Sequence, residues 1–188
     1  MKWYQFDWNR GSTQRILVTL ADSLRDLESE LDASKEQYQI DDALDRIESL
    51  LGISFVVAQG YVTSVVAAAR KLSPADPPIS KEEVLGLHNE TIPGTGITRL
   101  ELCDAMANYF KHHDEWPAWN HKGPHHKTVA VLQAVGIDQL EVTPCIRAVE
   151  MLFPSSESDE LNKLYALITG WRDRVIQSVA PDSSAPSA

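Results

Sequence analysis

Titratable side chains concentrate between residues 104 and 127, where the sequence reads DAMANYFKHHDEWPAWNHKGPHHK. Five of the six histidines lie in this segment, next to side chains of both charges and to two tryptophans. An imidazole titrates near neutral pH, so it serves as a general acid or base, or as a metal ligand. Acid–base chemistry or metal binding is therefore expected here before anywhere else in the chain.

Within this segment, polar residues recur at the spacing of a helical turn. At 3.6 residues per turn, one face collects four of them: Asp104, Asn108, His112 and Glu115. An amide and two carboxylates beside His112 would fix its tautomer or raise its pKa. These residues are candidates for catalysis, with the solvated face of an ordinary amphipathic helix as the alternative.

The segment ANYFKH, residues 107–112, closes a predicted helix in a chain that also holds a long apolar helix upstream. Over residues 36–116 the chain resembles the HEPN superfamily (higher eukaryotes and prokaryotes nucleotide-binding domains). Members are helical bundles, frequently dimeric, and many are metal-independent ribonucleases of toxin–antitoxin and phage-defence systems. Their motif is an Arg, often followed by a polar residue such as Asn, and ends in a His four to six positions on. Asn108 and His112 match the motif, whereas Ala107 stands at the Arg position.

The missing arginine bears on what this resemblance implies. Attack of a ribose 2′-hydroxyl on phosphate needs a proton acceptor or donor and a cation for the growing charge. Lys111, next to His112, would supply a point charge rather than a bidentate fork. The resemblance itself implies a HEPN-like core and a homodimer. Its activity would be weak metal-independent endoribonuclease cleavage, or binding of RNA, nucleotide or a partner without cleavage and without a cofactor.

The histidines also permit a metal site, which would make zinc or another divalent ion the cofactor. The candidate ligands are His112, His113, His121, His125 and His126, with Asp114 and Glu115 nearby. His121 and His125 lie four residues apart, but Gly123 and Pro124 interrupt any shared helical face. A native site requires at least three of these histidines around one point.

Net charge favours a third class of function, an interaction protein of the antitoxin or immunity type. The chain has 17 Lys+Arg against 27 Asp+Glu, a formal charge of −10. Such a surface repels phosphate backbones at long range and attracts a basic partner, so any RNA contact must be local. Trp116 and Trp119 would act either as exposed anchors for a partner or as buried plugs against the bundle.

Cysteine usage and the absence of export signals predict a cytoplasmic protein. Cys103 and Cys145 lie far apart inside apolar patterns, as buried small hydrophobes do. The first residues, MKWYQFDWNRGSTQR, lack the basic-then-apolar order of a signal peptide, and no 18-residue apolar run follows.

The length of 188 residues suits one domain, which we place at residues 1–180. An aromatic arm at residues 1–10 carries Trp3, Tyr4, Phe6 and Trp8, and would cover apolar surface or bind a partner. Residues 181–188, PDSSAPSA, are predicted to be a disordered tail.

Apolar periodicity predicts an all-α fold, a bundle of five to seven helices. Leucines spaced by three and four indicate a helix over residues 13–32, and a longer stripe runs from Ile40 to Leu72. Ile53, Val56, Val57 and Tyr61 lie off that stripe, which predicts that the long helix is central and buried on more than one side.

Helix boundaries are predicted for the second half from caps. Thr98 with Glu101 forms a capping box, and Trp116 before Pro117 ends that helix. A turn of helix at residues 80–88, a short helix from Pro124 to Gly136 and a last one through residues 161–175 complete the set. Two further start signals are Asp138–Glu141 and Thr143–Pro144.

Overall fold

The structure, a computed structural model, describes residues 7–73, 79–116, 118–119, 123–154 and 159–180. Its regular elements in these ranges are all helical: α1 (Arg10–Ala33), α2 (Gln37–Leu72), α3 (Lys81–Gly86), α4 (Arg99–His112), the short 3₁₀ helix η2 (His113–Glu115), α5 (His126–Ala134), α6 (Pro144–Leu152) and α7 (Glu160–Val179). The predicted all-α bundle of five to seven helices is confirmed. The HEPN-like core stays a prediction.

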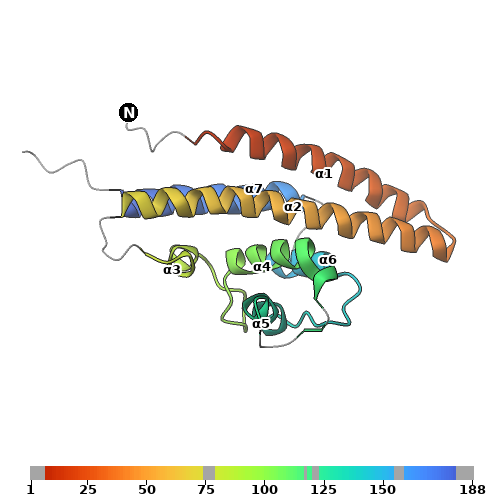
Figure 1. Cartoon of the computed structure of the whole chain (residues 1–188). Helices are drawn as coiled ribbons and strands as arrows, with labels where there is room; N and C mark the ends of the chain where they lie inside the picture. Colours follow the sequence, from red (N-terminus) through yellow and green to blue (C-terminus); the bar gives the residue numbers. More distant parts are fainter. Residues whose placement is uncertain (1–6, 74–78, 117, 120–122, 155–158, 181–188) are drawn as a thin grey trace, which may run out of the picture.

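The long helix α2 is the centre of the bundle. It contacts α1, α3, α4, α6 and α7, and Figure 1 shows α1 and α4 on opposite sides of it with α7 behind. A capping box between Glu36 and Gln39 starts α2, and Arg70 and Lys71 in its last turn complement the negative end of the helix dipole. The predicted central helix is therefore confirmed.

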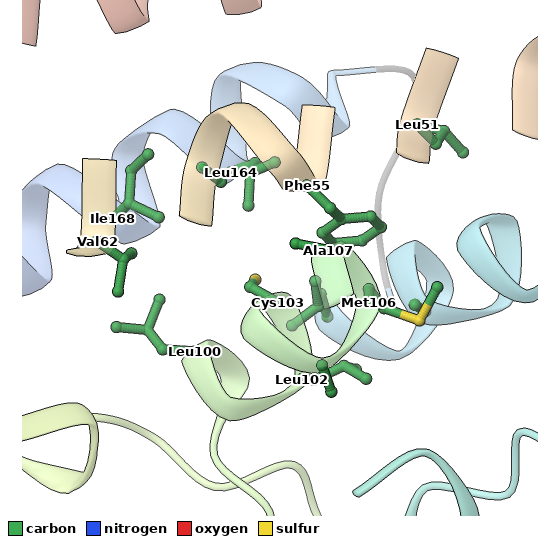
Figure 2. Close-up of a cluster of buried hydrophobic side chains, with 14 of the residues drawn as sticks. Leu51, Phe55, Val62, Leu100, Leu102, Cys103, Met106, Ala107, Leu164 and Ile168 are labelled. Carbon is green, nitrogen blue, oxygen red and sulfur yellow. The ribbon is translucent and has the colours of Figure 1, made fainter. Parts of the chain in front are cut away.

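Three helices supply most of the core drawn in Figure 2. Phe55 of α2, Cys103 and Ala107 of α4, and Leu164 and Ile168 of α7 are all buried in one hydrophobic cluster. The polar face of α4 thus lies opposite a fully apolar one. Packing of the apolar face against the core therefore sets the direction in which the polar face of α4 points.

A glycine brings α2 and α4 into close contact. A Cβ added at Gly52 would lie 2.0 Å from a ring carbon of Phe110, so the aromatic ring occupies the space that any other side chain would need. Glycine is required here by the packing of the two helices, not by the backbone conformation.

Burial of α2 is less complete than the sequence predicts. Tyr61 is buried and Val56 and Val57 are half-buried, but Ile53 is 47% exposed. The prediction that Ile53 is buried is wrong, because nearly half of its surface is exposed to solvent.

Local signals predicted most helix boundaries. The capping box at Thr98 opens α4, and Gly136 follows α5 with a positive φ of 81°. No helix starts at Asp138, whose carboxylate instead accepts the Leu140 N–H at 2.7 Å in a turn. Helix α6 begins at Pro144.

A side chain from another helix caps α6. The Glu48 carboxylate of α2 accepts the backbone N–H groups of Cys145 at 2.5 Å and Ile146 at 3.0 Å. These are N–H groups without a partner inside the helix, and a carboxylate there is also favoured by the helix dipole.

Only the end of the predicted aromatic arm falls within the described residues. Trp8 is 83% exposed, which argues against a lid at this position. Asp7 accepts a hydrogen bond from the Tyr61 hydroxyl and lies 3.5 Å from Nε of Arg172. Residues 1–6 and the tail 181–188 lie outside the described residues.

Two observations bear on the cellular environment. Helix α2 is long and apolar enough to cross a membrane, but 61% of its most apolar window is buried in the bundle, as in the core helix of a soluble protein. Cys103 and Cys145 are free and buried, as predicted. Burial raises the pKa of Cys103 to about 12, so its thiol stays protonated and unreactive.

Candidate functional site

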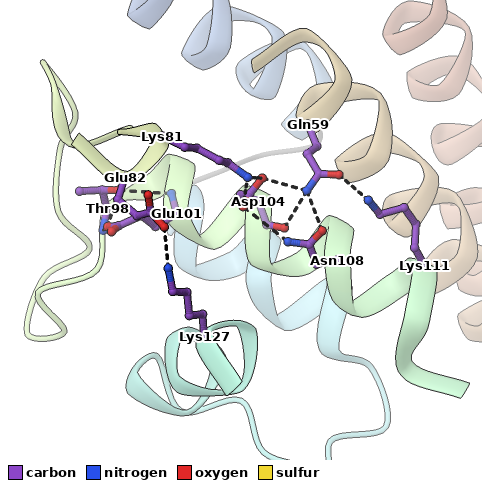
Figure 3. A network of polar contacts seen from close by, with 9 residues as sticks. All are labelled: Gln59, Lys81, Glu82, Thr98, Glu101, Asp104, Asn108, Lys111 and Lys127. Carbon is purple, nitrogen blue, oxygen red and sulfur yellow. Dashed lines mark hydrogen bonds and ion pairs between the residues drawn. The ribbon is translucent and has the colours of Figure 1, made fainter. Parts of the chain in front are cut away.

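A polar network connects α2, α3 and α4 (Figure 3). The amide nitrogen of Gln59 donates to Asp104 Oδ1 at 2.8 Å and to Asn108 Oδ1 at 2.9 Å. Its amide oxygen accepts from Lys111 Nζ at 2.7 Å, and Lys81 Nζ lies 2.7 Å from both Asp104 carboxylate oxygens. We call these five residues the Gln59 network.

The Gln59 network holds three of the five predicted catalytic residues, Asp104, Asn108 and Lys111. Each of the three makes a hydrogen bond with the Gln59 side chain, and the Asp104 side chain is only 16% exposed. A carboxylate with an amide and an ammonium partner has little capacity left for a substrate. This part of the polar face is therefore not simply solvated. It joins α4 to its neighbours.

The other two predicted residues lie apart from the network, at the end of α4. His112 Nδ1 is 3.5 Å from Glu115 Oε1, and both side chains are largely exposed. Although Lys111 and His112 are neighbours in sequence, Lys111 reaches back to Gln59. The structure thus divides the predicted catalytic set into two groups.

Two adjoining pockets form a groove beside α4. The first, about 450 Å³, lies between α3, α4 and α5 and includes Leu85, Ala105, Ala130 and Val131. The second, about 410 Å³, is lined by Asn108, His112, Glu115, Trp116, Pro124, His125 and Thr128. Asn108, Pro124 and Thr128 line both pockets, so we treat them as one α4–α5 groove. His112 and Asn108 therefore share a concavity.

Carboxylates outnumber lysines along the α4–α5 groove. Its lining has four carboxylate side chains, Glu82, Glu101, Asp104 and Glu115, against two lysines, Lys81 and Lys127. Lys127 pairs with Glu82 at 2.7 Å across the groove, and this hydrogen bond lowers the pKa of Glu82. Lys81 pairs with Asp104. The lysines are thus engaged with the chain itself, and the groove carries an excess of negative charge.

The aromatic residues after α4 pack on one another. Trp116 and Trp119 lie edge-on to the ring of Tyr109, at 5.9 and 5.8 Å between centroids, and both are half-buried. Burial raises the pKa of Tyr109. Of the two roles considered for these tryptophans, the geometry fits the packing role.

His125 is the most unusual histidine of the groove. Its ring stacks on Trp116 at 4.8 Å and 19°, and its Nε2 is buried without a hydrogen-bond partner among the described residues. The sequence placed His125 only in a metal-ligand cluster. The structure instead places it with His112 in the lining of one pocket.

The described histidines make separate local contacts. His113 stacks on Tyr109 at 4.9 Å, and Nδ1 of His126 lies 2.7 Å from the carbonyl oxygen of Gly123. Among the described residues no group of three His, Cys, Asp or Glu side chains is placed to hold a metal ion. His121 lies outside those residues, and the zinc site stays a prediction.

Ala107, at the position of the HEPN arginine, has no exposed surface. Its Cβ faces the core between α2 and α7 (Figure 2), so a guanidinium there would be buried in the hydrophobic cluster. The cation that the family motif supplies has no equivalent at this position. Placing Arg at residue 107 to restore it would destabilise the fold.

Sequence reasoning missed Gln59, Lys81, Glu82 and Lys127. Gln59 had a signal, because it is the one side chain with an amide in the apolar run ISFVVAQGYV. A polar residue in a buried stretch needs a partner. The other three lie on short helices whose placement the sequence leaves open.

Compared with protein-family models, with curated proteins and with solved structures, the chain matches none. Evidence about function therefore comes from the geometry and charge of the α4–α5 groove.

Proposed function

We propose that this chain is a non-enzymatic interaction module, which binds a basic segment of a protein partner in the α4–α5 groove. The observation that carries the proposal is the charge of this groove, four carboxylates against two lysines in a chain of net charge −10. Small apolar side chains such as Ala105 and Ala130 leave room between the charges. A segment that alternates basic and apolar residues fits both features.

Two features favour binding over catalysis. The polar atoms of Asp104, Asn108 and Lys111 already make hydrogen bonds within the chain. The arginine position of the HEPN motif is the buried Ala107, which leaves no guanidinium for a phosphorane. A cytoplasmic antitoxin or immunity-type protein, bound to a basic toxin or nuclease, is the setting that we propose.

The test uses two tryptophan substitutions on α5. Ala130 and Ala134 are both exposed, but only Ala130 lines the groove. The probe is a synthetic peptide of alternating lysine, alanine and leucine, titrated by calorimetry into the wild type, Ala130→Trp and Ala134→Trp.

We expect Ala130→Trp to weaken binding at least about ten-fold, or 1.4 kcal/mol, and Ala134→Trp to leave it unchanged. Binding of the wild type should also fall as salt increases. Equal binding by all three proteins, or equal binding of a peptide with glutamate in place of lysine, contradicts the proposal.

One observation favours a second function, metal-independent RNA cleavage. His112 and His125 line the same pocket, so one imidazole could take the proton of a ribose 2′-hydroxyl while the other protonates the leaving 5′-oxygen. The 2′-oxygen then bonds to phosphorus as the 5′-oxygen leaves. The HEPN resemblance of Asn108 and His112 points the same way.

Purified chain incubated with single-stranded RNA and a chelator tests this second function. If it applies, His112→Ala and His125→Ala each reduce cleavage about 100-fold or more, while His126→Ala, which is outside the pocket lining, retains it. Absence of RNA cleavage by the wild type would rule out this second function.

A further inference from the structure

The side of α2 that its neighbours leave open carries no charge over five turns. Its exposed and half-buried residues are Ser49, Ile53, Val56, Val57, Gly60, Thr63, Ser64, Ala67 and Ala68. In Figure 1 this helix lies in front of α7, with α1 and α4 to either side and no described helix in front. We call these nine residues the α2 face.

Charges of opposite sign flank the α2 face. Asp41, Asp42 and Asp45 precede it, and Arg70 and Lys71 follow it, all exposed and all on α2. Arg46, also before the face, is paired with Glu30 and Asp42. Two copies of α2 packed antiparallel would bring the acidic end of each helix to the basic end of the other. Parallel copies would oppose like charges.

Shape agrees with the same arrangement. An antiparallel pair with its two-fold axis between Val56 and Val57 places Ile53 against the partner's Gly60, and Asp42 against the partner's Lys71, because each pair is equally spaced about the axis. Ile53 is 47% exposed, whereas nothing lies within 4 Å of where a Cβ of Gly60 would be. A projecting side chain thus meets an open notch, twice per dimer.

We propose that the α2 face is the interface of a homodimer, with the two α2 helices antiparallel and crossing between Val56 and Val57. A shallow crossing of about 20°, as in four-helix bundles, keeps both charged ends in contact. From Asp42 to Lys71 the contact is about 43 Å long and one helix, about 10 Å, wide. This area is well below the roughly 800 Å² per partner of standard interfaces, so the dimer is reversible.

Sedimentation of the full chain over a range of concentrations tests the proposal. The wild type should pass from the 20.9 kDa of one chain to twice that mass as concentration rises. Ile53→Glu and Gly60→Leu should each abolish the dimer while circular dichroism shows an unchanged fold, because both positions are exposed. A wild type that stays monomeric, or a dimer that persists in both variants, overturns the proposal.

Charge reversal tests the register. Asp42→Lys and Lys71→Asp should each weaken the dimer about ten-fold, and the double variant should restore it, since the pair is then re-formed with its charges exchanged. Asp26→Lys, an equal charge change at an exposed position of α1, should leave the dimer unchanged. A double variant weaker than both single ones overturns the antiparallel register. Peptide binding by the α4–α5 groove does not involve these positions, so the two proposals fail or stand separately.

Discussion

Replacing Gly52 by alanine tests the packing of α2 on α4 most directly. The added Cβ would lie 2.0, 2.2 and 2.5 Å from three ring carbons of Phe110, one of which is Cγ. Because Cγ is bonded to the Cβ of Phe110, a rotation of the ring alone cannot clear the contact. Either Phe110 changes its χ1 rotamer and gives up its packing against α2, or this part of α4 moves away from α2.

The expected magnitude combines two opposing effects. Alanine in a helix interior is favoured over glycine by about 1 kcal/mol, while overpacking of a core costs about 1–3 kcal/mol and occasionally more. With contacts this short at Gly52, we expect the cost to lie at the upper end. The net loss in free energy of unfolding is then about 2 kcal/mol. For a chain of this length it lowers Tm by about 4–8 °C.

Gly60→Ala is the matched control, because it makes the same change in the same helix with nothing within 4 Å of the new Cβ. It should raise the free energy of unfolding by up to about 1 kcal/mol. Both variants are unfolded with urea and followed by circular dichroism. They carry Ile53→Glu if the wild type is dimeric, so that only the monomer is compared.

Equal stability of the two alanine variants would refute the reasoning, since it would mean that Phe110 does not cover Gly52. A double-mutant cycle adds a second check. In the Gly52→Ala background, Phe110→Leu should cost less than it does in the wild type, because the smaller side chain relieves the contact.

Three further predictions concern polar side chains. Glu48→Ala should lower the free energy of unfolding by about 1–3 kcal/mol, because it leaves two N–H groups of α6 unpaired, whereas the exposed Asp45→Ala should change it little. Gln59→Leu should cost a similar 1–3 kcal/mol, measured by urea unfolding, by removing the partner of Asp104, Asn108 and Lys111. Burial, with Glu160 nearby, raises the pKa of Glu28, so the folded chain binds this proton more tightly than the unfolded chain and loses stability as pH rises through that range. Glu28→Gln should therefore raise Tm near pH 7 and leave it unchanged near pH 4, and a Tm gain of equal size at both pH values would contradict this.

Several features of this fold follow from the sequence because they depend on residues close together in the chain. The stripe of apolar side chains from Ile40 to Leu72 predicts α2, and the reciprocal bonds of Thr98 and Glu101 predict where α4 begins. Gly136 likewise predicts where α5 ends, because a left-handed φ at a helix C-terminus is a local property that glycine adopts readily. Interactions over three or four residues need no knowledge of the tertiary structure.

The contacts that define the candidate site depend instead on how helices rotate and pack. Gln59 meets Asp104 across 45 residues, and Glu48 caps α6 across 97. The periodicity of α4 indicates which residues share its polar face, but not which neighbour that face meets. The packing of α4 against α2 turns Asn108 toward Gln59 and leaves His112 at the groove, a division that spacing along the chain does not contain.

The same dependence explains the exposure of Ile53. An apolar residue in a central helix is usually covered, but α2 has neighbours on only some of its sides. The sequence determined that this helix is long and apolar, because these properties belong to the residues themselves. Only the tertiary structure decided which of its sides stays open, because that depends on where the other helices pack around it.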